Sequence, residues 1–475
     1  MRSRDAVWVA KAAGATLVRD APPAAVAPDL DLAAPPEAGT DASAPGSDAA
    51  PPSAGDAPAG QDGAPAGTGP TRAVIDTHDA RLPGALFVGI PGARVDGGSF
   101  APQVLQGGAW GVLVRPEHAE AAAAVGHGVV LTHEDPARAL GLLARAWRWH
   151  LAATVVGITG SVGKTSTKDL LLSVVAPHKR AVATAANLNT EIGLPLTVLG
   201  AEEGTEVLIL EMAMRGAGQI AELAEIAEPD VGVITNVAPV HVELLGSLQA
   251  VADAKAEILY GLVPGGTAIV PADEPLLAGH RPPGAKLVEV HPDDPLPADL
   301  HVAGDVSATV LRNLPAVVAA ARAIGIEPAG EVRPEISAMR GQRLHLARDI
   351  VVVVDCYNAN PMSTTAALDD LATAATGRRV AVLGDMLELG PDEKRLHAEL
   401  GAHAKLTGVE VLVAVGPLSR HTGTGFGSGV QWVPDAEAAA ALVPKLLEPG
   451  DTVLLKASRG IGLERVADAL QGQDG

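Results

Sequence analysis

Short apolar runs alternate with stretches of helical period along most of the chain. Before residue 150 the runs are ALFVGI (85–90) and WGVLV (110–114), and an Ala-, Leu- and Arg-rich stretch predicts helical structure over residues 119–150. The later runs lack alternating polar positions: ATVVGITG (153–160), VLILEMA (207–213), VGVITNV (231–237), DIVVVVDCYN (349–358), RRVAVLGDM (378–386), VEVLVAVG (409–416) and DTVLLKAS (451–458). Strands of this kind are buried on both faces, as in parallel sheets covered by helices. The pattern therefore predicts an α/β fold.

A chain of 475 residues is long enough for about three domains of roughly 150 residues each. We expect a small mixed α/β N-terminal domain (1–150), a central α/β domain with a mainly parallel sheet (151–338) and a C-terminal, Rossmann-like α/β domain (339–475). Residues 21–70 contain 16 Ala and 11 Pro but no Lys or Arg. Because so few large apolar side chains cannot offset the entropy of ordering, we expect a disordered insert there.

The charge of the chain limits its partners. Lysine and arginine total 35 against 56 acids, a formal net charge of −21. Such a field repels phosphate backbones, so we expect no nucleic-acid binding, although a local basic site for a small anion is allowed. The single cysteine, Cys356, excludes an intrachain disulfide and a multi-cysteine metal site. Without a signal peptide or an apolar run of ~18 residues, we expect a cytoplasmic protein with no membrane insertion.

The strand at 153–160 runs into a glycine-rich turn and then into a stretch of helical period. In such a strand–turn–helix the backbone N–H groups face a phosphate, Lys164 reaches the β- and γ-phosphates, and the Thr165 hydroxyl ligates Mg²⁺. The full motif has glycine where this chain has Ile158, so the match is G-x-x-G-K-T. We predict a nucleotide-phosphate site, for ATP, formed by Thr159, Gly160, Ser161, Val162, Gly163, Lys164, Thr165 and Ser166.

Polar groups also follow other predicted strands. Glu211 ends VLILE, His241 follows VGVITNV, and Lys255 lies on the next helix. Singly these are explained as a helix-end acid, a loop residue and a solvated cation. Beside a Mg²⁺-nucleotide loop they become candidate metal and catalytic groups, because carboxylates and imidazoles at strand ends can ligate metals. The other candidates are a polar loop that turn chemistry also explains (Asn187, Asn189, Glu191), Asp355 after IVVVV, and Lys456, Ser458 and Arg459 at the end of the last strand.

The order of these motifs resembles that of the Mur ligase family. The resemblance rests on TGSVGKTSTK, NLNTEIGLP, EMAMRGAGQI, ITNVAPVHVELLGS, DAKAEIL, DCYNANPMS, LGDMLELG and LKASRG, which lie in family order within residues 71–465. LPGALFVGIPGARVDGGSF resembles the family's uridine-substrate domain. The resemblance implies a monomeric, ATP-dependent amide ligase of peptidoglycan synthesis. Its expected reaction adds D-alanyl-D-alanine to UDP-N-acetylmuramoyl-tripeptide through an acyl phosphate.

The resemblance also implies a role for each candidate residue. Lys164 and Thr165 would hold the ATP phosphates and a first Mg²⁺, and Glu211 and His241 would help to hold the metals. Lys255 would be carbamylated and so become a carboxylate-like Mg²⁺ ligand. Asn313 would lie near the adenine and Arg343 near the γ-phosphate, although a helix cap and a surface arginine explain these two as well. The residues expected around the nucleotide, the incoming amine and the substrate are Asp355, Tyr357, Asn358, Asn360, Asn187, Asn189, Glu191, Lys456, Ser458 and Arg459.

Two departures from the family pattern fall where the uridine substrate is gripped. Asp76-Thr77-His78 replaces Asp-Ser-Arg. Where the family has Asp-Gly-His before a phenylalanine, Gly97-Gly98-Ser99 precedes Phe100 here. Three alternatives stay open: a related ligase that adds diaminopimelate, lysine or folate-linked glutamate, a catalytically silent ATP-binding scaffold, and a plain P-loop kinase. The missing Asp-Asn-Pro-Arg motif and the additional N-terminal domain argue against the first. The retained metal-site residues argue against the second, and the third α/β domain argues against the third.

Overall fold

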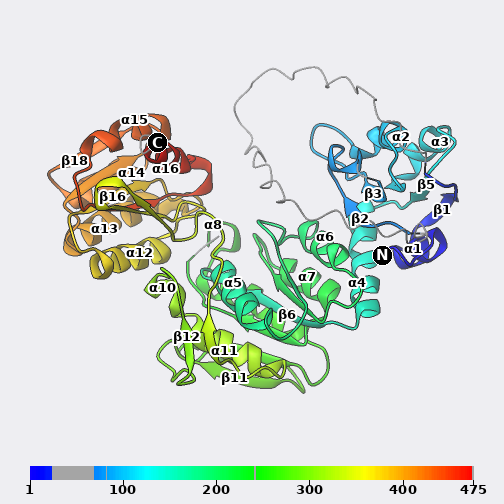
Figure 1. Cartoon of the computed structure of the whole chain (residues 1–475), viewed down its shortest axis with the longest axis horizontal. Coiled ribbons are helices and arrows are strands. Elements are labelled where there is room, and N and C mark those ends of the chain that lie inside the picture. Colours follow the sequence, from blue (N-terminus) through cyan, green and yellow to red (C-terminus); the bar gives the residue numbers. More distant parts are fainter. Residues whose placement is uncertain (24–68, 82, 240–241, 473–475) are drawn as a thin grey trace. The chain divides into compact units, whose positions relative to one another are not determined.

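The computed structural model describes residues 1–23, 69–81, 83–239 and 242–472 (Figure 1). Residues 24–68 of the predicted disordered insert lie outside this range, as does the candidate ligand His241. By their contacts the described residues form two compact units. One contains Met1–Val155, Arg180–Leu210 and Glu222–Glu228, and the other contains Val156–Lys179, Glu211–Ala221 and Pro229–Gly475. Within the described ranges, no helix has the length and apolar character needed to cross a membrane.

The N-terminal sheet has the strand order β1-β5-β4-β3-β2, with β1 antiparallel to β5 and the other neighbours parallel. Its elements are α1 (Ala6–Ala12), β1 (Thr16–Arg19), β2 (Arg72–Val74), β3 (Ala85–Val88), α2 (Ala101–Gln106), β4 (Gly111–Val114), α3 (Ala119–Ala123), β5 (Val129–Thr132) and α4 (Pro136–Leu151). The expected helical stretch at 119–150 is wrong in its middle, where β5 separates α3 from α4. Gly126 and Gly128 take positive φ values there, which ends α3, and the β-branched VVLT segment then pairs as a strand.

The central sheet has the strand order β11-β10-β9-β6-β8-β7. Its strands are β6 (Thr154–Thr159), β7 (Ala181–Ala183), β8 (Val207–Glu211), β9 (Val231–Ile234), β10 (Thr267–Pro271) and β11 (Lys286–Val290). The accompanying helices are α5 (Lys164–Val175), α6 (Gly193–Gly200), α7 (Gln219–Ala227), α8 (Val242–Leu245), α9 (Leu248–Tyr260), α10 (Ala308–Leu311) and α11 (Leu314–Ala323). A separate parallel pair consists of β12 (Leu300–Val302) and β13 (Gly330–Val332). In this sheet β10 pairs with β11 and β9, β6 with β9, and β7 with β8, and all four pairs are parallel, as predicted.

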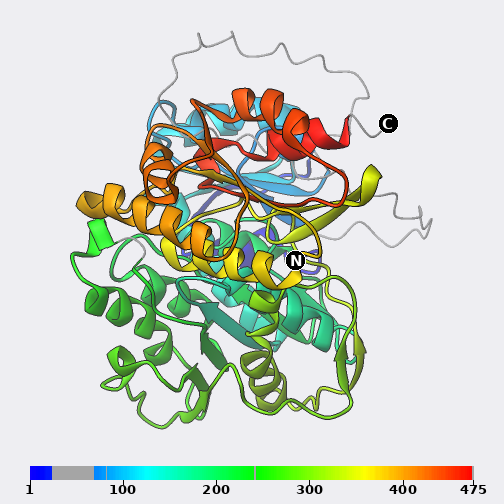
Figure 2. The ribbon, with the colours of Figure 1, turned by 90° about the vertical axis from the view of Figure 1, so that its left-hand side faces the viewer.

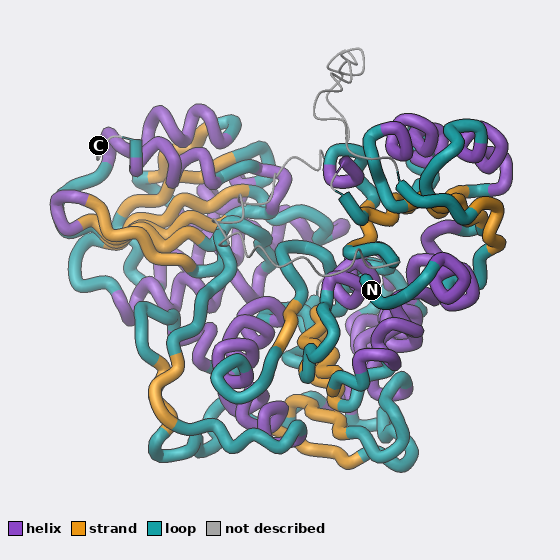
Figure 3. Tube along the Cα trace, turned by 45° about the vertical axis from the view of Figure 1, so that its right-hand side comes forward, coloured by secondary structure: helices purple, strands orange, loops and turns teal. Residues whose placement is uncertain are grey.

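The C-terminal sheet has the strand order β14-β15-β19-β16-β17-β18, and β14 is its antiparallel edge strand. Its strands are β14 (Gln342–Leu346), β15 (Ile350–Val354), β16 (Arg379–Gly384), β17 (Val411–Val415), β18 (Val430–Val433) and β19 (Thr452–Lys456). Its helices are α12 (Pro361–Ala374), α13 (Glu393–Leu406), α14 (Ser419–Phe426), α15 (Ala436–Leu446) and α16 (Glu464–Gln471). Figure 3 shows these strands as adjacent orange tubes with purple helices around them.

Both faces of the C-terminal sheet are buried. Alternate strand residues such as Val352 and Val380 belong to a core with α15 and α16, whereas Ala381 and Leu454 belong to a core with α12 and α13. Figure 2 shows α16, in red, on one side of this sheet and α12 and α13, in yellow and gold, on the other. The uninterrupted apolar runs in the sequence follow from this burial. The predicted three-part α/β fold is confirmed, while the boundaries near residues 150 and 338 stay predictions.

Candidate active site

The phosphate loop connects β6 to α5 and depends on two glycines. Gly160 has φ of 150°, and a Cβ on it would lie 1.9 Å from Thr235 Oγ1. Gly163 has φ of 83° and immediately precedes α5. Glycine is therefore required at the first position by close packing and favoured at the second by backbone conformation.

Residues after β9 hold the loop in shape. Asn236 Oδ1 accepts a hydrogen bond from the Val162 N–H, and Asn236 Nδ2 donates to the Val162 carbonyl, both at 2.9 Å. Thr235 Oγ1 also donates to the Val162 carbonyl at 2.6 Å. The Ser161 hydroxyl donates to the Ala238 carbonyl at 3.1 Å. Thr235 and Asn236 were not among the predicted site residues, although they lie in the ITNVAP motif, at the end of the predicted strand VGVITNV.

Lys164 starts α5 and turns back over the loop. Its Nζ donates to the Gly160 carbonyl at 2.8 Å. Burial lowers the pKa of Lys164, the positive charge of Arg340 lowers it further, and the carboxylate of Glu211 opposes both. The charged form of a buried lysine is stabilised by a nearby anion, and a nucleotide phosphate would supply one.

Thr165 and Glu211 meet beside the loop. The Thr165 hydroxyl donates to Glu211 Oε2 at 2.7 Å, and the two residues are only 2% and 1% exposed. A hydroxyl and a carboxylate at the mouth of a phosphate loop are oxygen donors of the kind that Mg²⁺ prefers. These two residues therefore fit a magnesium ion.

Lys255, on α9, is 2% exposed. Burial lowers its pKa well below the usual value, and the charge of Lys164 adds to the effect. We find no hydrogen bond or ion pair for its amine within the described ranges. A buried lysine of this kind favours the neutral, nucleophilic form. The amine is thus suited to carbamylation, which would add a carboxylate to the donor set.

Two further ATP candidates differ in their surroundings. A Cβ on Gly163 would lie 3.0 Å from Asn313 Oδ1, so the Asn313 amide packs against the phosphate loop. Its Nδ2 also donates to the Val310 carbonyl at 3.2 Å. Arg343, on β14, instead forms an ion pair with Asp305 at 2.9 Å. The structure therefore places Asn313 beside the loop and gives Arg343 a carboxylate partner of its own.

Asp355 and Lys456 form an ion pair between the ends of β15 and β19. Lys456 Nζ lies 2.6 Å from Asp355 Oδ2 and donates a hydrogen bond to the Asn358 carbonyl at 3.1 Å. Lys456 is only 2% exposed. Burial raises the pKa of Asp355, while the Lys456 charge and its hydrogen bond oppose that shift. The lysine thus stabilises both the carboxylate and the loop after β15.

The remaining C-terminal candidates also make protein contacts. Ser458 Oγ accepts from the Leu387 N–H at 2.9 Å and contacts the Ala359 carbonyl at 3.4 Å, so it joins two loops. Asn360 caps α12 in a reciprocal pair with Ser363. The other candidates are Arg459, paired with Glu464 at 2.5 Å, Tyr357, stacked under Arg340, and Asn358, whose Oδ1 accepts from the Ala359 N–H.

The polar loop between β7 and α6 belongs to the other compact unit. Asn187 and Glu191 are exposed there, and Asn189 is partly buried. The Asn189 N–H donates to the Asn187 carbonyl at 2.8 Å, and Ala186 has a positive φ of 46°. These features are typical of a tight turn, and a substrate role for the three residues stays a prediction.

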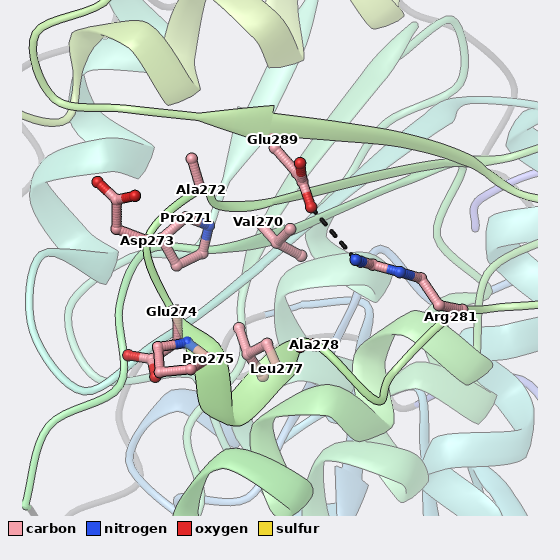
Figure 4. A pocket seen from close by; sticks show the side chains of 10 residues that line it. All are labelled: Val270, Pro271, Ala272, Asp273, Glu274, Pro275, Leu277, Ala278, Arg281 and Glu289. Carbon is pink, nitrogen blue, oxygen red and sulfur yellow. Dashed lines mark hydrogen bonds and ion pairs between the residues drawn. The ribbon is translucent and has the colours of Figure 1, made fainter.

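A hollow of about 470 Å³ lies at the carboxyl end of β10 (Figure 4). Arg281 and Glu289 form an ion pair at 3.3 Å on one side of it, and Asp273 and Glu274 lie on the other. None of the predicted site residues lines this hollow. The predicted chemistry therefore lies elsewhere, at the ends of β6, β8, β15 and β19.

Known proteins match the chain along most of its length. The model of the Mur ligase middle domain matches residues 158–294, and that of the Mur ligase, glutamate ligase domain matches residues 339–459. The chain is 35% identical to the UDP-N-acetylmuramoyl-tripeptide–D-alanyl-D-alanine ligase of Synechocystis sp., over 82% of this chain and 90% of that protein. The chain belongs to the Mur ligase family.

Another similar member of the family carries the same name as the Synechocystis protein. The UDP-N-acetylmuramoyl-tripeptide–D-alanyl-D-alanine ligase of Mycobacterium tuberculosis is 36% identical, with the same shares covered. The crystal structure of MurF ligase from Thermotoga maritima in complex with ADP superposes with a TM-score of 0.73. It is 27% identical and covers 85% of this chain and 97% of that one. The chain thus resembles the D-alanyl-D-alanine-adding ligases in both sequence and fold.

Proposed function

We propose that this chain is the ATP-dependent ligase that joins D-alanyl-D-alanine to UDP-N-acetylmuramoyl-tripeptide and so makes the UDP-linked pentapeptide. The observation that carries the proposal is the cluster of Lys164, Thr165, Glu211 and Lys255 at a phosphate loop, in a chain whose relatives carry this activity in their names. A cluster of cation, hydroxyl and carboxylate suits phosphoryl transfer, which needs positioning and charge stabilisation.

The reaction proceeds in two steps. The substrate carboxylate attacks the γ-phosphorus of ATP, so that a new O–P bond forms while the bond to ADP breaks and ADP leaves with the electron pair. The dipeptide amine then attacks the acyl carbon and loses a proton, and the tetrahedral intermediate expels phosphate. Activation is needed because a free carboxylate is a poor electrophile. The phosphate loop and Lys164 hold the phosphates, and Asn313 packs against Gly163 of that loop.

Magnesium would be held by Thr165, Glu211 and a carbamylated Lys255, with His241 as a fourth candidate. When bound, the metal offsets the repulsion between an anionic nucleophile and the triphosphate. The lowered pKa and burial of Lys255 support a carbamate there, because a neutral amine adds CO₂ and releases a proton, which leaves an anion.

The C-terminal candidates are assigned to the nucleotide and to the incoming amine. We assign Asp355 and Tyr357 to direct contacts, since they lie on the loop after β15. Lys456, Ser458 and Asn360 act by holding that loop, because their polar groups are engaged by the protein. A monomer that works in the cytoplasm, where ATP is abundant, fits these substrates, and the charge of −21 disfavours nucleic acid.

The test is phosphate release from ATP and Mg²⁺, measured with the tripeptide substrate and D-alanyl-D-alanine together and with each alone. We expect release that requires both, with a product heavier by one dipeptide in mass spectrometry. Turnover with another amine, such as diaminopimelate, lysine or glutamate, would instead identify a different ligase. Nucleotide binding without turnover on any substrate would favour a silent scaffold.

A further inference from the structure

The loop after β16 (residues 385–390, the β16 loop) lies in the motif LGDMLELG, and no catalytic or binding role has been assigned to it. Its backbone is fixed by two side chains from other elements. The Met386 N–H donates to His397 Nε2 at 3.0 Å, and the Leu387 N–H donates to Ser458 Oγ at 2.9 Å. Because consecutive N–H groups are held in this way, the residue that follows them is presented in a defined position.

That residue is Glu388, whose backbone is strained. Its φ is 62°, in the left-handed region that residues with a side chain rarely adopt. Glycine takes such a conformation without this cost, and Gly390 does so two residues later with φ of 67°. The Glu388 side chain is exposed. Strain that is kept where glycine would relieve it is common at functional sites, and it indicates that the carboxylate itself is used.

The β16 loop has neighbours from the candidate active site at both of its ends. Ser458, which accepts from the Leu387 N–H, also donates to the Ala359 carbonyl on the loop after β15 at 3.4 Å. At its other end the β16 loop runs into the 3-10 turn η6 (Gly390–Asp392), which contacts α8. In the chain, α8 follows β9 and the residues that hold the phosphate loop in shape. Glu388 lies where the β16 loop passes from the first neighbour to the second.

The second step of the proposed reaction needs a proton acceptor. Near neutral pH the α-amino group of a dipeptide is largely protonated, and an ammonium group has no lone pair with which to attack. We propose that the Glu388 carboxylate binds the ammonium group of the incoming dipeptide and takes one of its protons. A carboxylate suits both tasks, because it accepts charge-assisted hydrogen bonds and can act as a general base. This inference rests on the proposed function, since it concerns the amine that the ligase uses.

The step balances without a further reactant. Glu388 gains one proton from the ammonium group, and the freed lone pair forms the C–N bond to the acyl carbon. When the tetrahedral intermediate collapses, the C–O bond to phosphate breaks and phosphate takes the electron pair. It leaves as hydrogen phosphate with a second proton from the nitrogen, so that a neutral amide remains. Glu388 then returns its proton to the solvent, to which its side chain is exposed.

The test compares a charged nucleophile with a neutral one. The full-length chain is given ATP, Mg²⁺ and the tripeptide substrate, together with either D-alanyl-D-alanine or hydroxylamine. Hydroxylamine is largely uncharged near neutral pH and converts an acyl phosphate to a hydroxamate without the help of a base. In Glu388→Gln we expect kcat/KM for D-alanyl-D-alanine to fall at least about 100-fold, whereas hydroxamate formation stays within about 2-fold of the wild-type rate.

A second variant separates the carboxylate from the fold. Glu388→Gly relieves the backbone strain, which offsets the freedom that glycine adds to the unfolded chain, so its thermal unfolding should resemble that of the wild type. It should nevertheless lose as much activity with the dipeptide as Glu388→Gln does. A residue that served only to shape the loop would not give this combination of unchanged stability and lost activity.

Glu437→Gln is the matched control, because Glu437 is another exposed carboxylate, on α15 beside the same sheet, and it should change neither reaction. Equal losses with both nucleophiles in Glu388→Gln would overturn the assignment. Turnover of the dipeptide by Glu388→Gln at the wild-type rate would refute this inference alone. Hydroxamate formation by the wild-type chain without any product from D-alanyl-D-alanine would refute the proposed function and, with it, this inference.

Discussion

Two lysines at the candidate site lie where their surroundings disfavour a positive charge. Lys164 and Lys255 are both lysines with lowered pKa, and the charge of the first lowers the pKa of the second. A phosphate near Lys164 and a carbamate on Lys255 would each reduce this electrostatic penalty. We therefore test the Lys255 amine and the phosphate loop separately.

Replacing Lys255 with Ala should reduce kcat at least about 100-fold, because the carboxylate-like ligand is lost. Acetate or another short carboxylate should restore part of the activity by filling the vacated space. The measurement is phosphate release with and without acetate. Lys394→Ala, on the exposed face of α13, is the control and should behave like the unchanged protein. Full turnover by Lys255→Ala without acetate would remove this lysine from the site.

Replacing Gly160 with Ala should abolish tight ATP binding. The added Cβ would lie 1.9 Å from Thr235 Oγ1, and the φ of 150° is strained for alanine, so the loop must shift. Such strain costs about 1–3 kcal/mol of stability. Gly216→Ala is the matched control, since its Cβ would meet nothing within 4 Å. Calorimetric ATP affinity tests the prediction, and unchanged affinity in Gly160→Ala would contradict it.

At the scale of elements, hydrogen bonds connect the loops at the carboxyl ends of β15, β16 and β19. His397, a fully buried residue of α13, accepts from the Met386 N–H through Nε2 at 3.0 Å. Its Nδ1 lies 2.7 Å from the Glu393 carbonyl, which can only accept. These partners require the neutral ring with its proton on Nδ1. The loop after β16 is therefore tied to α13 by an uncharged histidine.

This arrangement predicts a pH dependence of stability. Burial lowers the pKa of His397, so the unfolded chain binds a proton on this ring at a higher pH than the folded chain does. The contribution is fully present above the ordinary pKa of about 6.5 and is lost as the pH falls through the folded pKa. His397→Gln should flatten the fall in unfolding free energy between pH 7.5 and 5.5, whereas the exposed His301→Gln should not. An unchanged slope in His397→Gln would refute this.

The Asp355–Lys456 pair gives a second prediction for these loops. Lys456→Met leaves the Asp355 carboxylate without its cation and should destabilise the protein by about 3 kcal/mol, the low end for a buried pair because the Asp355 side chain is 25% exposed. The double variant with Asp355→Asn should recover a large part of that loss. Chemical denaturation of both variants and of Asp355→Asn alone gives the coupling energy. Additive losses would show that the pair is not coupled.

For the molecule as a whole, nucleotide and metal should stabilise the fold together. A ligand that binds the folded state raises its stability in proportion to the logarithm of concentration over Kd. We expect Mg²⁺-ATP to raise the melting temperature by a few degrees, and EDTA to remove most of that gain. The melting temperature of Lys164→Met should rise little with Mg²⁺-ATP, whether or not EDTA is present. An EDTA-insensitive shift would mean that the phosphates bind without the metal assigned to Thr165 and Glu211.

Much of the fold follows from local sequence alone. The apolar runs from residue 153 onward form strands that are buried on both faces, so they contain no alternating polar positions. That pattern can be recognised in the sequence without a structure. The helix prediction was wrong in the middle of residues 119–150, where alanine-rich segments of high helix propensity flank the four-residue strand β5. Pairing with β4 and β1 makes VVLT a strand, and such long-range pairing leaves no periodic signal in so short a segment.

The sequence by itself predicted the phosphate loop, because its lysine, threonine and two glycines lie within a few residues of one another. It also determined the α/β class, since strand burial sets composition directly. The tertiary structure decided which distant groups meet: Glu211 with Thr165, Asn236 with the loop, Lys456 with Asp355, and Arg340 with Tyr357. These pairs are separated by 17 to 101 positions along the chain, and only the packing of strands and helices brings them within contact.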